Sequence, residues 1–484
     1  MWKPVLAAIP AMLYSTFTFA AGTASCEQVL KQLASQLTDA TCVESTDLTT
    51  RNPATTPEDN AIKSLPPFAF MPRSDRAILM PDERRRTPIL KAVPGLQIQA
   101  RFASDPLQQG RFLLRLPKDW NGRLVIAGAS GARSEFNGDF AWSDYLVQKG
   151  YAYASQNKGV LSSQSSQADD PLACRTAPDS DTYMRYYDNE AGQEFTRWRD
   201  FMVLAAQVAR QGVQFAYGKA PRYTYAVGTS NGGYQVRRAV ESAPEQFDGG
   251  VEWAGTYVGE LGPNLLTALP PAIRNFQAYQ DSGYAADSLA ARNLLAAGYP
   301  PDLIIEKDGK KTSFLAYHSM HFWEPTQCQW QKRLDPDYNT YGAGPGNYNY
   351  LARLSASGVG KNVAAIATTG HIRRPLITVA GTMDGLLPID LHARAYARQV
   401  AAQAGRNAPA YRLYEIQNGN HVESLADDFP QLELMWPHAQ HAFDLLVAAV
   451  EQKKTLPPAQ CVPRGARIAE QPAQPGHCAQ LLQP

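Results

Sequence analysis

One corner of the chain constrains its fold more than any other stretch. Residues 222–228 (RYTYAVG) predict a β-strand, and the residues after Ser230 carry apolar side chains at helical spacing. Between the two lies Gly-Thr-Ser-Asn-Gly (228–232), which leaves room only for a sharp turn. A strand that runs directly into a helix predicts an α/β protein with a serine at the carboxyl end of the strand.

The glycines on either side of Ser230 have a physical reason. A strand-to-helix turn this tight strains the serine backbone, and side chains two residues before and after it would collide. The hydroxyl is then expected to project above the sheet at a helix N-terminus, where free N–H groups favour negative charge. The pattern predicts Ser230 as a nucleophile; the alternative is a glycine-rich turn with a solvated serine.

Other segments repeat this alternation of strands and helices. Strands are predicted at 110–117, 122–128, 150–156, 375–381 and 410–416, and helices at 195–218 and 438–452. This order predicts a mainly parallel, twisted sheet covered by helices on both faces.

The chain is expected to divide into consecutive parts, one of which interrupts the alternation and covers the carboxyl edge of the sheet as a lid. These parts are a signal peptide (1–20), an irregular N-terminal segment (21–94), the first part of the α/β core (95–255), the lid insertion (256–365), the second part of the core (366–455) and a disulfide-tied tail (456–484).

The beginning of the chain has the layout of a secretory signal. An early lysine precedes an apolar run that ends in small residues, with cleavage expected near Ala20. An uncleaved membrane anchor is the alternative. We expect a periplasmic or secreted protein whose mature form contacts no membrane.

Six cysteines, an even number, fit an oxidising compartment. Proximity along the chain favours two short loops near the termini and leaves one long-range pair. The expected disulfides are Cys26–Cys42, Cys461–Cys478 and Cys174–Cys328. The cysteine spacing indicates no zinc site, and a net charge of +1 without a basic block indicates no nucleic-acid partner.

A serine attacks efficiently only when a base removes its proton. Among eight histidines, His421 lies on a polar loop after a strand and before the final helix, where this architecture requires the base. Asp384, on the turn after strand 375–381, is expected to orient the imidazole, and Asp390 is the nearby competitor. The order Ser230, Asp384, His421 is that of α/β-hydrolases.

The transition state also needs donors for its negative oxygen. The backbone amide of Asn231, which follows the serine, is one candidate. The second is expected from the loop after strand 122–128, where the amide of Gly131 is favoured over that of Ser130.

Five motifs in order resemble the tannase and feruloyl esterase family of the α/β-hydrolase superfamily. They are WNGRLVIAGASG, LVQKGYAYASQNKG, GTSNGGYQVRRAVESAPEQFDGGV, PLITVAGTMDGLLPI and NGNHVES. The resemblance implies a Ser-Asp-His triad and a lid after Trp253. Core members carry a disulfide between cysteines beside the serine and the histidine; Thr229 and Val422 stand there instead. The SNGG motif is also similar to hydrolases of 3-hydroxybutyrate oligomers.

We therefore expect an exported serine carboxylic-ester hydrolase that acts on aromatic esters of the hydroxycinnamate or gallate kind. Hydrolysis of 3-hydroxybutyrate oligomers, a peptidase or amidase on the same scaffold, and a non-catalytic binding protein remain alternatives. No cofactor is expected, although a calcium ion in the lid stays an alternative. Residues that could line the acyl pocket are Trp253, Phe322, Trp323, Tyr338 and Tyr341.

Overall fold

The computed structural model describes most of the chain after its first residues. The described ranges are 24–52, 54–55, 87–131, 134–136, 138–160, 164–185, 195–336, 338, 345–356 and 358–483. The predicted signal peptide (1–20) lies outside them.

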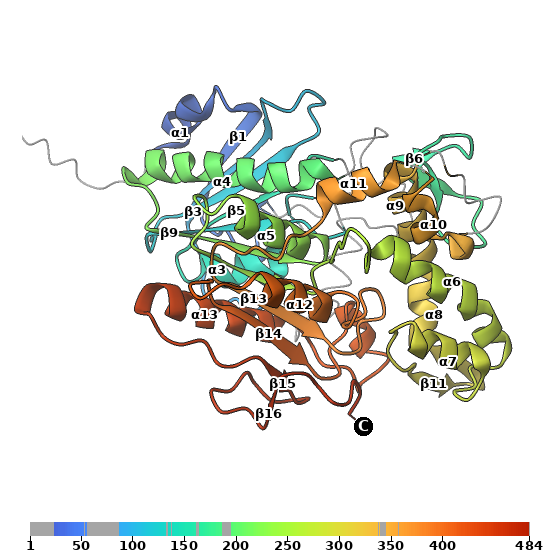
Figure 1. Cartoon of the computed structure of the whole chain (residues 1–484). Coiled ribbons are helices and arrows are strands. Elements are labelled where there is room, and N and C mark those ends of the chain that lie inside the picture. Colours follow the sequence, from blue (N-terminus) through green and yellow to red (C-terminus); the bar gives the residue numbers. More distant parts are fainter. Residues whose placement is uncertain are drawn as a thin grey trace, which may run out of the picture.

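An eleven-stranded sheet forms the centre of the molecule (Figure 1). Across the sheet the strands are β1 (Leu37–Ser45), β2 (Gly95–Phe102), β3 (Arg111–Pro117), β5 (Ala152–Gln156), β4 (Arg123–Gly128), β9 (Tyr223–Thr229), β10 (Gly249–Trp253), β13 (Leu376–Gly381), β14 (Tyr411–Ile416), β15 (Gln460–Val462) and β16 (Gln474–Pro475). Neighbouring strands are parallel from β5 to β15 and antiparallel at both ends.

From β2 to β14 the strands lie side by side in the order in which they occur along the chain, with one exception: β5 lies between β3 and β4. That arrangement decides the fold class. The chain has an α/β-hydrolase fold.

Helices cover both faces of the sheet, as its apolar strands require. One face packs against α1 (Cys26–Leu33), α4 (Thr196–Tyr217), α5 (Asn231–Ser242) and α12 (Ala393–Gln403). The opposite face packs against α3 (Asp144–Val147) and α13 (Trp436–Gln452). Figure 1 shows α4 and α13 on opposite sides of the strands.

The insertion is helical and lies beside the sheet, on the right in Figure 1. It contains α6 (Leu265–Asp281), α7 (Leu289–Ala296), the hairpin β11 (Ile304–Lys307) and β12 (Lys310–Ser313), α8 (Phe314–His318), η3 (Ser319–Trp323), α9 (Glu324–Leu334), η4 (Pro345–Asn347), α10 (Tyr350–Leu354) and α11 (Val359–Ile366). Its buried side chains form one apolar cluster that also includes Met383, Leu386 and Val422 from the sheet's loops.

A small sheet from the first part of the core joins this insertion. Its strands are β6 (Gln164–Ser166), β8 (Tyr183–Arg185) and β7 (Cys174–Arg175). The Cys174–Cys328 disulfide links β7 to α9. Residues before the serine corner are therefore linked to the insertion predicted at 256–365.

Several elements were not predicted from the sequence, β2 among them. The segment 21–94, predicted to be irregular, contains α1 and the edge strand β1. Most side chains of β1 are exposed or half-buried, so its sequence lacks the apolar pattern on which the prediction relies. The buried strand β10 begins with two glycines and was not predicted.

The predicted cysteine pairing is confirmed. The disulfides are Cys26–Cys42, Cys174–Cys328 and Cys461–Cys478. Within the described ranges, no helix is both long and apolar enough to cross a membrane.

Candidate active site

Ser230 lies at the corner between β9 and α5, with φ 58° and ψ −122°. Residues other than glycine seldom adopt this conformation, and it persists only where neighbouring groups hold it. The Ser230 N–H donates to the carbonyl of Trp253 at 2.9 Å, and its carbonyl accepts from the amides of Tyr234 and Thr256 at 3.1 and 3.3 Å. These three bonds fix the corner.

Close backbone contacts explain the glycines around the serine. A Cβ atom on Gly228 would lie 2.3 Å from the carbonyl oxygen of Gly232, and one on Gly232 would lie 2.6 Å from that of Gly128. The first turn of α5 therefore touches the ends of both β9 and β4. A larger residue at any of the three positions would push the turn away from the sheet.

His421 joins the serine to a carboxylate. Its Nδ1 lies 2.8 Å from Oδ2 of Asp384, and its Nε2 lies 3.1 Å from Oγ of Ser230. The three residues follow β9, β13 and β14, whose carboxyl ends lie at one edge of the sheet. The structure thus brings together the three predicted triad residues at hydrogen-bonding distance.

The second oxygen of Asp384 is also occupied. Its Oδ1 accepts from the amides of Leu386 at 2.9 Å and Leu387 at 2.6 Å. Two backbone donors fix the orientation of the carboxylate. When Nδ1 of His421 donates to Oδ2 of Asp384, Nε2 is the ring nitrogen that can accept from the serine hydroxyl.

The turns that carry the acid and the base are joined by their backbones. The amide of Met383 donates to the carbonyl of Gly419 at 2.7 Å, and that of Thr382 donates to the carbonyl of Ile416 at 3.0 Å. A Cβ atom on Gly381 would lie 2.3 Å from the carbonyl carbon of Gly419. Asp384 and His421 therefore sit on one connected unit.

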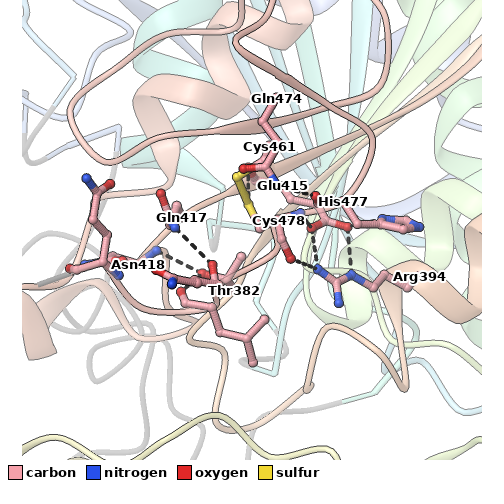
Figure 2. The surroundings of a disulfide bond; sticks show 12 residues. Thr382, Arg394, Glu415, Gln417, Asn418, Cys461, Gln474, His477 and Cys478 are labelled. Carbon is pink, nitrogen blue, oxygen red and sulfur yellow. Dashed lines mark hydrogen bonds and ion pairs between the residues drawn. A yellow bond between two sulfur atoms is a disulfide. The ribbon is translucent and has the colours of Figure 1, made fainter.

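The end of the chain is bonded to this unit (Figure 2). The Thr382 hydroxyl donates to the carbonyl of Leu481 and accepts from the amide of Asn418 at 2.9 Å. The Asn418 side chain donates to the carbonyl of Gln483 at 2.6 Å and accepts from its amide at 2.7 Å. The tail 478–483 therefore supports both the acid turn and the base turn.

A buried carboxylate and a disulfide anchor the start of that tail (Figure 2). Glu415 on β14 is fully buried and accepts two bonds from Arg394, at 2.8 and 2.6 Å, and one from the amide of Cys478, at 2.7 Å. Cys478 is also bonded to Cys461 on β15.

The predicted oxyanion residues lie where α5 touches the end of β4. Asn231 is the first residue of α5, and its Oδ1 accepts from the hydroxyl of Thr256 at 3.0 Å. Gly131 is buried in the loop after β4. In the same loop, the amide of Ala129 donates to Oε1 of Gln235 at 2.9 Å. Both candidate amides thus belong to segments fixed by buried side chains.

The predicted pocket aromatics are mostly packing residues. Trp253 and Trp323 are fully buried, Trp253 in the core beneath α13 and Trp323 in the insertion core, so neither offers a surface to a ligand in this structure. Phe322 is also buried, and Tyr338 packs against Tyr348 with ring centroids 5.3 Å apart. Tyr341 lies outside the described residues.

Trp323 instead reaches the acid turn. Its Nε1 donates to the carbonyl of Gly385 at 2.8 Å, next to Asp384. The insertion is therefore bonded to the turn that carries Asp384.

Two buried histidines near the acid were not predicted as part of the site. His318 of α8 packs against Gly385, where a Cβ atom would lie 3.0 Å from its ring. Burial lowers the pKa of His318 to about 4, and burial lowers that of His392 to about 3, with smaller opposing contributions from Asp384. Both imidazoles are neutral near pH 7. No local sequence signal distinguishes them from surface histidines.

Across the residues that the structure describes, no group of three or more His, Cys, Asp or Glu side chains could hold a metal ion. Residues 335–347, an aspartate-containing part of the predicted lid, are only partly described, so the calcium alternative stays open.

Known proteins match this chain in two ways. Residues 336–481 match the family model of 3HB-oligomer hydrolase, a range that contains Asp384 and His421. The D-(-)-3-hydroxybutyrate oligomer hydrolase of Burkholderia thailandensis is 31% identical over 134 residues, which cover 24% of this chain and only 18% of the relative. Its counterpart in Burkholderia mallei matches to the same extent. This chain is similar to 3-hydroxybutyrate oligomer hydrolases over part of its length.

Among solved structures, feruloyl esterase B from Aspergillus oryzae is 12% identical, with a TM-score of 0.48 and coverage of 87% of this chain and 88% of that one. Tannin acyl hydrolase from Aspergillus niger is 13% identical, with a TM-score of 0.46 and coverage of 86% and 83%.

Proposed function

We propose that the protein is a serine carboxylic-ester hydrolase. One observation carries the proposal: a single imidazole, His421, lies within hydrogen-bonding distance of both the Ser230 hydroxyl, at 3.1 Å, and the Asp384 carboxylate, at 2.8 Å. The serine occupies a strained corner at the N-terminus of a twelve-residue helix. Acyl transfer requires a nucleophile, a base and an orienting acid in this relation.

The roles follow from the hydrogen bonds. Nε2 of His421 accepts the Ser230 proton while Oγ attacks the ester carbonyl, and Asp384 stabilises the imidazolium that forms. The amides of Asn231 and Gly131 are the proposed donors to the tetrahedral oxyanion. His421 then protonates the leaving alcohol, and water attacks the acyl-enzyme by the same steps in reverse.

Short 3-hydroxybutyrate oligomers are the favoured substrate class. The family match spans the segment that carries the acid and the base, and the similar Burkholderia proteins are named for hydrolysis of these oligomers. Aromatic esters are the second candidate, on the five sequence motifs that resemble tannases and feruloyl esterases. The buried positions of Trp253 and Trp323 reduce the support for an aromatic acyl pocket.

We also propose that the protein works outside the cytoplasm. Three disulfides and no free cysteine among the described residues fit an oxidising compartment. Sequencing the N-terminus of protein recovered from the periplasm or the medium tests this proposal; an intact residue 1 on active protein contradicts it.

The decisive experiment compares the wild type with Ser230→Ala on p-nitrophenyl butyrate, a 3-hydroxybutyrate dimer and trimer, and methyl ferulate. The expected result is turnover by the wild type and a loss of about 10³-fold or more in kcat for the variant. Ser166→Ala, in the small sheet with β7, is the matched control and should keep wild-type rates. Turnover by folded Ser230→Ala contradicts the triad, and a wild type that binds these esters without hydrolysis supports a binding protein.

A further inference from the structure

A buried cation lies beside the proposed oxyanion loop. Lys158 follows β5 and is fully buried, and its Nζ donates to the carbonyl oxygen of Ser130. Its Nζ also lies 4.6 Å from the ring centroid of Trp198. Burying an ammonium group is costly unless polar groups face it, and the Ser130 carbonyl and the Trp198 ring are two groups that do so.

The backbone of the turn that carries Lys158 is fixed by its conformation and its contacts. Lys158 has φ 65° and Gly159 φ 75°, both in the left-handed region. A Cβ atom on Gly159 would lie 2.0 Å from the ring of Phe201, so only glycine fits there. The Asn157 side chain donates to the carbonyl of Val160 at 2.6 Å and closes the turn.

Two buried glutamines connect this turn to the same loop. Oε1 of Gln235 on α5 accepts from the amide of Ala129 at 2.9 Å and from Nε2 of Gln156 at 3.2 Å. Oε1 of Gln156 in turn accepts from the amide of Lys158 at 2.5 Å. The loop is therefore bonded at two consecutive residues, by Gln235 at Ala129 and by Lys158 at Ser130.

The lysine binds one end of a peptide group whose other end is the Gly131 N–H. The bond between Ser130 and Gly131 is trans, so its C=O and N–H point in opposite directions. Fixing the direction of the Ser130 oxygen fixes the direction of the Gly131 N–H. A cation on the oxygen also polarises the group and strengthens its N–H as a donor.

We propose that Lys158 is a positioning residue that sets the direction and strength of the Gly131 oxyanion donor. This inference rests on the proposed ester hydrolysis. In a low-dielectric site, the same positive charge also favours the negative oxygen of the tetrahedral intermediate over the neutral ester. Lys158 therefore acts on the transition state more than on substrate binding.

The test is Lys158→Met, which keeps the length of the stem and removes the charge. We expect kcat to fall by about 10- to 100-fold with KM changed by less than about threefold, because one oxyanion donor is weakened rather than deleted. Affinity for an alkyl boronate, which forms a tetrahedral adduct on Ser230, should fall by a similar factor. Lys149→Met removes a half-exposed lysine paired with Asp444 and should change none of these values.

Each result has one meaning. An unchanged kcat, or a rise in KM without a fall in kcat, overturns the role of Lys158. Absence of ester turnover and of Ser230 labelling in the wild type refutes the proposed function instead. If Lys158→Met does not fold, a crystal structure of the wild type with a phosphonate on Ser230 decides: the phosphonyl oxygen should accept from the Gly131 N–H while Lys158 contacts Ser130, and any other donor in that place overturns the inference.

Discussion

A histidine between a carboxylate and a hydroxyl has one productive tautomer, and the carboxylate selects it. Asp384 is well suited to this task because two backbone amides occupy one of its oxygens and leave the other for His421. Because that donor set consists of main-chain groups, it would survive replacement of the side chain by an amide. The role of the Asp384 carboxylate can therefore be tested with asparagine, a side chain of nearly the same size.

Asp384→Asn should lower kcat by about 10³- to 10⁴-fold with little change in KM, because an Asn NH₂ directed at Nδ1 stabilises the wrong tautomer. Steady-state kinetics on p-nitrophenyl butyrate measure the effect. Asp390→Asn is the matched control, since Asp390 is half-exposed and pairs with Arg394. Equal losses in the two variants contradict the assignment of the acid.

Buried neutral histidines predict a loss of stability in acid. The pKa of His318 is about 4 in the folded protein, against 6.5 for an unperturbed histidine. Between these values the unfolded chain binds the proton and the folded one does not, so stability present above pH 6.5 is lost as the pH falls toward 4. His318→Phe should reduce this slope by up to about 1.4 kcal/mol per pH unit.

Urea unfolding at several pH values measures this slope. His371→Phe, which replaces an exposed histidine, provides the control. A slope unaltered in His318→Phe would show that this histidine protonates alike in the folded and unfolded chain.

Sequence reasoning predicted Ser230, Asp384 and His421 because each of them follows a segment that is recognisable as a strand. It did not find Lys158 and His318, because their positions near the site result from contacts with residues distant in the sequence. Lys158 bonds a residue 28 positions earlier, and the ring of His318 packs on the turn after β13. The local sequence around each residue does not indicate such long-range contacts.

Helix α5 is held against the sheet by contacts between glycine backbones. These contacts place its N-terminus at the carboxyl ends of β4 and β9, so the serine corner lies beside the loop that follows β4. The apolar spacing of α5 predicted the helix, but only the approach of Gly232 to Gly128 explains its position.

Gly232→Ala should destabilise the fold by about 1–3 kcal/mol and lower activity further than that loss of folded protein explains, since the added methyl meets backbone at 2.6 Å. Chemical unfolding and kcat are the measurements. Gly405→Ala, with no atom within 4 Å of its added methyl, is the control. Full activity in Gly232→Ala contradicts the tight packing of this element.

Across the whole molecule, two disulfides of nearly equal loop length lie in different functional surroundings. Cys26–Cys42 spans 16 residues at the N-terminal edge, and Cys461–Cys478 spans 17 residues at the start of the tail that supports the acid and base turns. Loop-closure entropy predicts similar contributions to stability from both. We expect only the Cys461–Cys478 disulfide to affect kcat.

The double variants Cys26→Ser/Cys42→Ser and Cys461→Ser/Cys478→Ser should each lose about 3 kcal/mol of unfolding free energy. At a temperature where both double variants are folded, kcat should fall only in Cys461→Ser/Cys478→Ser. Thermal unfolding and initial rates separate the two effects. Equal kcat in both double variants would remove the tail from any role in holding the catalytic turns.

The apolar cluster of the insertion contains Met383 and Leu386, from the turn of Asp384, and Val422, which follows His421. Selectivity and rate therefore cannot be tuned independently by exchanging this segment. A chimera that receives the insertion of another protein with this fold would have mismatched packing beside Asp384 and His421. It would need the turns that carry these two residues transplanted with the insertion.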